Sequence, residues 1–311
     1  MKPFKNILYV TEKAVDQVSA LERAISLAEN NQAKLSVIEV VPAVDDAYRT
    51  DVINSHKKNL ESLIGPYRSR LAIQNDVLMG TTFLEVIHAV LRNAHDIVLK
   101  PAEQPFFMKR IFGSDDMHLL RKCPCPVWLM KPPEKNHYHR ILAAVDFNPL
   151  NPSTSEEALN HEIIGLSCSL ALTDSADLHL VHAWETFAEK SILSRGDISD
   201  DRIVDAHVQK QYALHQKGFH QLGDALLDQI GPEAYDRISP RFHLHMGPAK
   251  KIIAELSAEL QADIVVMGTI ARTGISGLII GNTAEAILDQ LECSVLAIKP
   301  PGFSTPVKLF G

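Results

Sequence analysis

The sequence predicts an α/β protein built from two copies of one doubly wound, mostly parallel sheet domain. Two observations indicate this class. Short apolar runs rich in Val and Ile alternate with longer segments whose apolar residues recur at helical spacing. The order of these runs in residues 1–133 then returns in residues 138–301. A parallel sheet with helices on both faces explains why strand-like and helical segments alternate. A tandem duplication explains why the same order of segments occurs twice.

The first copy contains five apolar runs that we interpret as strands. They are separated by helical patterns such as Leu21, Ile25 and Ala28, which share one face of a helix. A longer and more polar segment, residues 48–72, is compatible with a helix whose buried face is formed by Leu60, Leu63 and Ile64. The expected strands are residues 7–11, 34–41, 76–80, 96–100 and 126–131.

The second copy repeats these strands in the same order and is longer. Its period exceeds that of solenoid arrays, so the copies are expected to be domains. A polar, proline-bearing connector separates them at residues 132–137, and residues 302–311 form a tail. The matched segments are 6–12 with 140–146, 34–41 with 177–183, 77–80 with 242–247, 95–100 with 262–268, and 125–132 with 293–300.

Composition narrows the class of function. Hydrophobic residues make up 46% of the 311 residues and charged residues 22%, as in ordinary globular proteins. The formal charge of −7 argues against nucleic acid as a partner. No run approaches the ~20 apolar residues of a membrane span, and no secretory signal is visible, so we expect a cytoplasmic protein.

The cysteines and histidines do not form a convincing metal pattern. Cys123 and Cys125 precede a strand, and we interpret them as small buried hydrophobes in preference to a metal or redox pair. Four histidines fall on expected strands without a carboxylate or thiol at zinc spacing, so we expect strand-edge histidines and no metal. They are His179, His182, His243 and His245.

The strongest candidate site follows the strand that ends at Gly268. A glycine-containing segment leads from there to Gly281, where a new helix is expected to begin with Asn282 and Thr283. A strand, a glycine loop and a helix N-terminus can hold an anion through backbone N–H groups. Asp146 ends another strand and is expected to line the same crevice. A ligand-free alternative is that Asn282 and Glu285 form a capping box.

With these segments in view, the chain resembles the universal stress protein family in its tandem two-domain type. The resemblance spans both halves and is closest at residues 95–100, 118–128 and 268–285. It implies a five-stranded, flavodoxin-like (Rossmann-like) doubly wound sheet in each domain. It also implies that the domains pair as a pseudo-dimer, for which the last strands, residues 127–131 and 295–299, are the expected pairing elements.

The resemblance further implies an adenine nucleotide, ATP or AMP, in the second domain, with Mg²⁺ only as its companion. Nucleotide-binding relatives carry Gly-x-x-Gly, nine residues, then Gly-Ser or Gly-Thr. Here two positions depart from that pattern, Ala271 in place of the second glycine and Asn282 in place of the hydroxyl residue. The positions carried over are Asp146, Gly268, Ala271, Gly281, Asn282 and Thr283, with Arg272 and Lys251 as candidate phosphate partners.

The first domain departs further from the pattern. Glu12 stands at the position of Asp146, and Lys100-Pro101 stands at that of Met267-Gly268. Gly113-Ser114 is kept, but Asp115 and Asp116 follow it and would repel a polyphosphate. We therefore expect the first domain to be structural.

These observations predict a stress-response protein that acts by binding and is not an enzyme. A slow ATPase is disfavoured because no general base or metal-carboxylate pair is evident. The alternatives are an interaction or scaffold protein with empty crevices, and a binder of another small or lipid-like ligand. Association into a homodimer is also compatible with the sequence.

Overall fold

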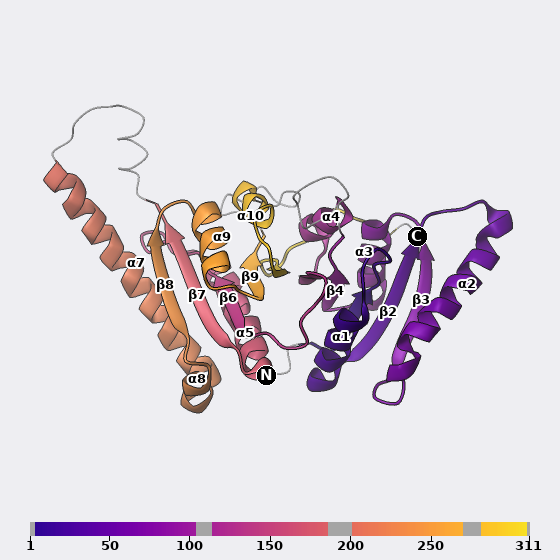
Figure 1. Ribbon diagram of the computed structural model, residues 1–311. Helices are drawn as coiled ribbons and strands as arrows, with labels where there is room; N and C mark the ends of the chain where they lie inside the picture. Colours follow the sequence, from indigo (N-terminus) through magenta and orange to yellow (C-terminus); the bar gives the residue numbers. More distant parts are fainter. Residues whose placement is uncertain (1–3, 104–113, 186–200, 270–280, 310–311) are drawn as a thin grey trace.

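A computed structural model describes residues 4–103, 114–185, 201–269 and 281–309, with backbone alone for residues 201–205. All its strands join one ten-stranded sheet in the order β3-β2-β1-β4-β5-β10-β9-β6-β7-β8 (Figure 1). The first half comprises β1 (Asn6–Val10), α1 (Val18–Asn31), β2 (Lys34–Val41), α2 (Asp46–Ile64), η1 (Gly65–Tyr67), β3 (Ile73–Met79), α3 (Thr82–Asn93), β4 (Ile97–Pro101), α4 (Ser114–Lys122) and β5 (Val127–Met130). The second half comprises β6 (Arg140–Ala144), α5 (Thr154–Asp174), β7 (Asp177–Trp184), α7 (Asp201–Ile230), α8 (Pro232–Ile238), β8 (Arg241–Met246), α9 (Ala249–Glu259), β9 (Ile264–Gly268), α10 (Asn282–Leu288) and β10 (Ser294–Ile298).

Each half is a five-stranded parallel sheet, as the sequence predicts. In the first half β1 pairs with both β2 and β4, and in the second β6 pairs with both β7 and β9. The chain therefore builds each sheet outward in one direction and then in the other from its first strand. This reversal places a topological switch point between β1 and β4, and a second between β6 and β9.

The two sheets join through their last strands, β5 and β10. This pair is antiparallel, with Leu296 opposite Trp128 and Val295 opposite Leu129. All four side chains are buried, in keeping with the apolar sequences of β5 and of residues 295–298 of β10. The predicted pairing of the last strands is confirmed, and it makes the two domains one continuous sheet.

The connector between the domains is part of this seam, although its polar sequence predicts only a boundary. Tyr138 and Glu134 are buried, and the Tyr138 hydroxyl donates to Glu134 at 2.5 Å. The indole N–H of Trp128 donates to the Tyr138 oxygen at 3.1 Å, and the Ser294 hydroxyl donates to Glu134 at 2.8 Å. Burial raises the pKa of Glu134.

A buried ion pair lies beside the same seam and joins helices of different domains. The Arg23 guanidinium of α1 donates to both carboxylate oxygens of Asp174, at the end of α5, at 2.9 and 2.5 Å. The two side chains are 6% and 1% exposed. The guanidinium also lies 4.3 Å from the centroid of the Tyr138 ring. Bidentate geometry and ring contact let this pair persist away from water.

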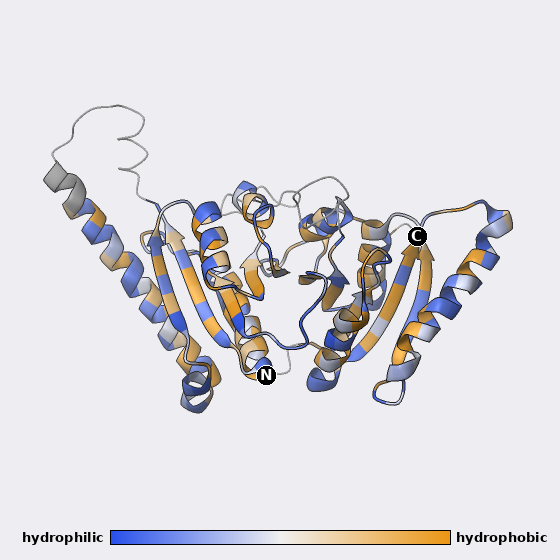
Figure 2. Cartoon of the chain, viewed as in Figure 1, coloured by the Kyte–Doolittle hydropathy of each residue, from blue (hydrophilic) through white to orange (hydrophobic). Residues whose placement is uncertain are grey.

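The helices form two layers that sandwich the sheet, and neighbouring residues of a strand face opposite layers. Ile7 and Tyr9 of β1 belong to the core layer that contains buried residues of α1, α2, α5, α7 and α8, whereas Leu8 and Val10 belong to the layer that contains those of α3, α4, α9 and α10. Figure 2 shows the resulting apolar strands between helices of mixed polarity. None of the described helices combines the length and the apolar character needed to cross a membrane.

The long helix α7 docks through two glycines at the outer edge of the second domain. A Cβ on Gly218 would lie 2.6 Å from the Phe147 ring, and one on Gly223 would lie 3.1 Å from the Phe242 ring. Both rings therefore fit where α7 lacks side chains. This close approach orients α7 along β8, as Figure 1 shows.

Candidate functional site

The second switch point brings two of the predicted site residues to one edge of the sheet. β6 and β9 are parallel neighbours, with Ala144 opposite Met267. Asp146 follows β6 by two residues, and Gly268 ends β9. Ligands of open α/β sheets bind outside the carboxyl ends of strands at such a point.

The backbone at Asp146 is fixed by a buried amide. Asn160 of α5 is 2% exposed and makes two hydrogen bonds there. The Asp146 N–H donates to the Asn160 amide oxygen at 3.1 Å, and the Asn160 amide donates to the Asp146 carbonyl at 2.8 Å. Asp146 itself is exposed. The paired bonds hold the exposed residue at a defined place without using its side chain.

Gly281 lies against the end of β9. Its N–H donates to the Thr269 carbonyl at 2.9 Å, and the Thr269 N–H donates to the Ile298 carbonyl of β10 at 3.1 Å. The two residues that flank residues 270–280 are thus bonded to each other at the switch point. Ala271 and Arg272 lie outside the described residues. Lys251 lies on the exposed side of α9, with its ammonium 3.8 Å from Glu255.

Helix α10 begins at Asn282, but the capping box that the sequence offers as an alternative is not formed. Gly281 is the N-cap and has no side chain to accept a hydrogen bond. Asn282 and Thr283 lie exposed in the first turn. Glu285 instead pairs with Arg121 of α4, so its carboxylate turns toward the other domain. Sequence spacing alone could not anticipate this partner, 164 residues away.

Gly268 has a packing reason to be glycine. A Cβ at this position would lie 2.7 Å from the Cδ2 atom of Leu159. Leu159 belongs to α5 and contacts the apolar core beneath the sheet edge. The sequence interpretation assigns Gly268 to ligand approach, and the structure adds this helix contact. Because packing alone accounts for Gly268, Asp146 is the stronger indication of a ligand site.

A buried lysine that the sequence analysis did not identify lies beside the end of β9. Lys299 follows β10 and is 6% exposed. Its ammonium donates to the Thr269 hydroxyl and to the Leu120 carbonyl of α4. Burial lowers the pKa of Lys299 to about 8. The contact ties the end of β9 to a helix of the first domain.

The corresponding edge of the first domain is occupied by the chain itself. Lys100, at the end of β4, is fully buried. Its ammonium lies 2.9 Å from a carboxylate oxygen of Glu12, which follows β1, and 2.9 Å from one of Asp116, in the first turn of α4. Asp116 also accepts the Glu103 N–H at 2.7 Å. Salt bridges of Lys100 therefore join the ends of β1 and β4 to the first turn of α4 across the switch point.

The sequence predicts that Asp116 would repel a phosphate. In the structure, the Asp116 carboxylate forms an internal salt bridge with Lys100. Although burial opposes the charge, Asp116 and Glu12 raise the pKa of Lys100, so it is a cation. Burial, followed by the Asp116 charge, raises the pKa of Glu103 to about 7. One feature of the sequence could have indicated this salt bridge. Lys100 stands where the second domain has Met267, and the neighbouring strand is followed by Glu12.

The strand histidines are paired inside the second domain, which corrects the strand-edge interpretation for β7. His179 Nδ1 lies 2.9 Å from His243 Nε2, and His182 Nε2 lies 2.9 Å from His215 Nδ1. β7 is flanked on both sides, and His179 and His182 are buried. Burial lowers the pKa of His179 to about 4. Within the described residues, no group of three or more His, Cys, Asp or Glu side chains is placed to hold a metal.

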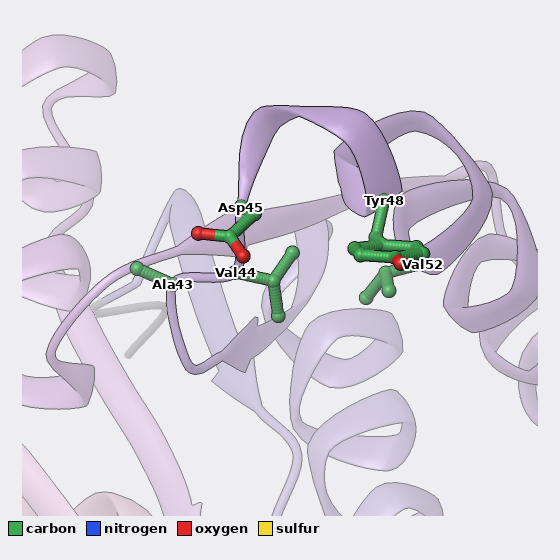
Figure 3. Close-up of a pocket in the computed structure, with 5 residues that line it drawn as sticks. All are labelled: Ala43, Val44, Asp45, Tyr48 and Val52. Carbon is green, nitrogen blue, oxygen red and sulfur yellow. The ribbon is translucent and has the colours of Figure 1, made fainter.

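Two hollows lie at other places. One of about 730 Å³ lies where β2 leads into α2, lined by Ala43, Val44, Asp45, Tyr48 and Val52 (Figure 3). The other, of about 330 Å³, lies between α7 and β8. Tyr48 is 64% exposed and Val44 40% exposed, so the first hollow presents apolar surface to solvent.

Comparison with known proteins identifies the group to which this architecture belongs. A profile described as the universal stress protein family matches residues 3–131 and again residues 137–299. The chain belongs to the universal stress protein family. The two matches fall on the two halves of the sheet, so this is a tandem member.

Relatives of similar length share the tandem organisation. Universal stress protein E of Escherichia coli (strain K12) is 29% identical, covering 99% of this chain and 98% of its own. A universal stress protein E homolog of Haemophilus influenzae is 26% identical over 96% and 98%. A crystal structure of a putative universal stress protein from Pseudomonas aeruginosa UCBPP-PA14 has a TM-score of 0.72 at 25% identity, covering 96% and 94%. One from Archaeoglobus fulgidus has a TM-score of 0.58 at 15% identity, over 94% and 98%, which is likeness of fold.

Proposed function

We propose that this universal stress protein acts by binding and that its second domain holds one adenine nucleotide. The observation that carries the proposal is the placement of exposed Asp146 beside Gly268 at the second switch point, with Gly281 bonded to Thr269 at the same edge. A strand-end carboxylate is suited to accept hydrogen bonds from ribose hydroxyls. The exposed first turn of α10 offers N–H groups to phosphate.

The two domains differ in what fills this place. In the first, Lys100 neutralises Glu12 and Asp116 inside the protein. A nucleotide there would have to displace a salt bridge whose buried charges would lose their partners. In the second, Met267 stands at the position of Lys100, and Asp146 is exposed. The proposed stoichiometry is therefore one nucleotide per chain.

A nucleotide search and a titration test this function. Protein purified without added nucleotide is denatured by heat, and the supernatant is analysed by mass spectrometry for AMP, ADP and ATP. The same protein is titrated with ATP and with GTP, with and without Mg²⁺, by calorimetry. The account expects adenine nucleotide in one of the two experiments, and absence from both would refute it. Phosphate release is expected to stay at the level of the Asp146→Ala variant, since binding and not hydrolysis is proposed.

Asp177→Ala is a matched control for Asp146→Ala. Asp177 is also exposed, but it begins β7 at the opposite, amino end of the sheet. It lies 3.7 Å from Arg241, an exposed pair of small energetic value. Loss of binding in the Asp146 variant with full binding in the Asp177 variant assigns the nucleotide to the switch point. Equal loss in both would indicate an effect of net charge.

A second candidate is an interaction protein, favoured by the exposed apolar hollow at the start of α2. Tyr48 and Val44 would present this surface to a protein partner. Under this alternative no nucleotide binds, and Tyr48→Ser abolishes cross-links to the cellular partner while Asp146→Ala leaves them. Under the nucleotide proposal, Tyr48→Ser leaves the ATP titration unchanged.

A further inference from the structure

The cysteines of the Cys-Pro-Cys segment form a thiol pair. They lie between the end of α4 and the start of β5, and their sulfur atoms are 3.6 Å apart. The Cys123 N–H donates to the Leu119 carbonyl at 2.9 Å, which continues α4 to this residue. Sequence composition favours two independent small hydrophobes, and it gives no reason for both sulfur atoms to face each other.

The geometry is close to that of a disulfide. An S–S bond is about 2.05 Å long and joins residues whose Cα atoms are about 4.4–6.8 Å apart. Residues two apart in a chain have Cα atoms at most about 7 Å apart. The two sulfur atoms, 3.6 Å apart, would have to approach each other by about 1.5 Å to form the bond.

A buried ammonium favours a thiolate at this place. Burial alone would raise the pKa of Cys123, but the side-chain and backbone hydrogen bonds with Cys125, and to a smaller extent the Lys299 charge, more than offset it, so this pKa is lowered. The pKa of Cys125 is raised in the same pair. The described residues form no salt bridge with Lys299, and its charge is one of the influences that lower the pKa of Cys123.

We propose that Cys123 and Cys125 are an oxidisable dithiol that hydrogen peroxide converts to an intramolecular disulfide. The Cys123 thiolate attacks one peroxide oxygen, the O–O bond breaks, and the hydroxide that leaves takes a proton to become water. The Cys125 sulfur, after losing its proton to solvent, then attacks the Cys123 sulfenic acid and displaces hydroxide, which becomes a second water. Two electrons pass from sulfur to peroxide. This inference does not depend on nucleotide binding.

The protein contains its own controls. Cys125 and Cys293 are each 8% exposed, and Cys123 and Cys168 are each fully buried. Exposure therefore cannot distinguish the pair from the other two cysteines. Burial raises the pKa of both Cys168 and Cys293 to about 12. Because the thiolate is the reacting species, the pair is expected to react at least about tenfold faster than either.

Oxidation of the dithiol is expected to affect the contact between the two domains. Val127, two residues after Cys125, is opposite Ala297 of β10. A disulfide also removes the thiolate charge that interacts with Lys299, whose ammonium donates to Thr269 and Leu120. The dithiol is thereby linked to the end of β9 as well as to the pairing of the two domains.

The test is peroxide treatment of the native full-length chain at pH 7, followed by alkylation in denaturant and tryptic mapping. Cleavage after Lys122 and Lys135, with the Lys131–Pro132 bond resistant, releases both cysteines on one peptide, residues 123–135. The expected result is loss of the mass of two hydrogens from this peptide, reversed by dithiothreitol, while Cys168 and Cys293 remain thiols. Oxidation of the pair no faster than Cys293, or conversion of Cys123 to sulfinic acid without a disulfide, would overturn the proposal.

Two variants examine the mechanism in the folded protein. Cys125→Ser is expected to stop at a sulfenic acid on Cys123, detected as a dimedone adduct. Lys299→Met is expected to slow disulfide formation severalfold, because it removes a positive charge that favours the reacting thiolate of Cys123. Lys131→Met, at the corresponding place after β5, is the control and is expected to keep the rate of the unmodified chain. Equal rates for both lysine variants would contradict a role for the Lys299 ammonium.

Discussion

Replacing Lys100 by Met, the residue at the corresponding position of the second domain, should destabilise the protein strongly. Lys100 and Asp116 are fully buried, and Glu12 is 19% exposed. Removing the ammonium leaves the Asp116 carboxylate buried without its ion pair, whereas Glu12 can turn toward water. Breaking a buried pair by removing one partner costs about 3–5 kcal/mol. At about 2–4 °C per kcal/mol, the Tm of the chain should fall by about 6–20 °C.

A compensated variant separates charge from packing. Lys100→Met combined with Asp116→Ala reproduces Met267 and Ala284 of the second domain. Because this variant has no unpaired buried charge, most of the lost free energy of unfolding should return. In the single variant the buried Asp116 carboxylate has lost the Lys100 ammonium, and taking up a proton removes its charge. Its protonation therefore favours folding, and the deficit measured at pH 7 should shrink toward pH 5.

Urea denaturation of the three proteins at pH 5 and pH 7 measures these differences. A loss of less than about 1 kcal/mol for Lys100→Met at pH 7 would refute the reasoning, since that is the scale of an exposed pair. A double variant less stable than the single one would also refute it. In that case Asp116 would be held by contacts other than the Lys100 ammonium.

Three further predictions concern the seam, the outer helix and pH. Arg23→Ala removes the bidentate partner of buried Asp174 and should cost about 3–5 kcal/mol, measured by urea denaturation. Gly218→Leu overpacks against the Phe147 ring and should cost about 1–3 kcal/mol by the same assay. The pKa of Glu103 is raised to about 7, so the folded state keeps a proton that the unfolded state loses near pH 4.5. Stability from this group should fall as pH rises from about 4.5 to 7, and Glu103→Gln should remove that slope from a pH series of melting curves.

The first two of these changes have controls in the first domain. Arg70 makes exposed pairs with Glu22 and Glu29, and Arg70→Ala should cost less than about 1 kcal/mol. A Cβ on Gly65 would meet nothing within 4 Å, so Gly65→Ala should be close to neutral. Equal effects for Arg23→Ala and Arg70→Ala would contradict the importance of burial. An unchanged pH slope in Glu103→Gln would assign that slope to other groups.

The sheet was predictable because each strand is marked by a local sequence pattern that occurs in both halves of the chain. Each parallel strand is buried on both faces, so it appears as a short continuous apolar run, and the duplication shows every run twice. The pairing of the two domains followed from the same property, since residues 127–130 and 295–298 remain apolar although they end their domains. The helix α2 also forms with Leu60 and Ile64 buried, as its spacing indicates.

The side-chain partners were not predictable, because they join residues far apart in the chain. Lys100 looks like the polar end of a strand until Glu12 and Asp116 are placed around it. The connector appears solvated in sequence, yet Tyr138 is buried by residues of both domains. In each case charge or polarity predicts exposure on its own, and a partner supplied by the fold reverses the outcome.

The central proposal is that the two halves differ, with the Lys100 salt bridges at the switch point of the first and a nucleotide bound at Asp146 in the second. Calorimetric titration of ATP into the unmodified chain and into Asp146→Ala tests it most directly. The account predicts one ATP per chain for the former and loss of binding for the latter, with unchanged melting of both apoproteins. Two ATP per chain, or one that persists in Asp146→Ala, would contradict it.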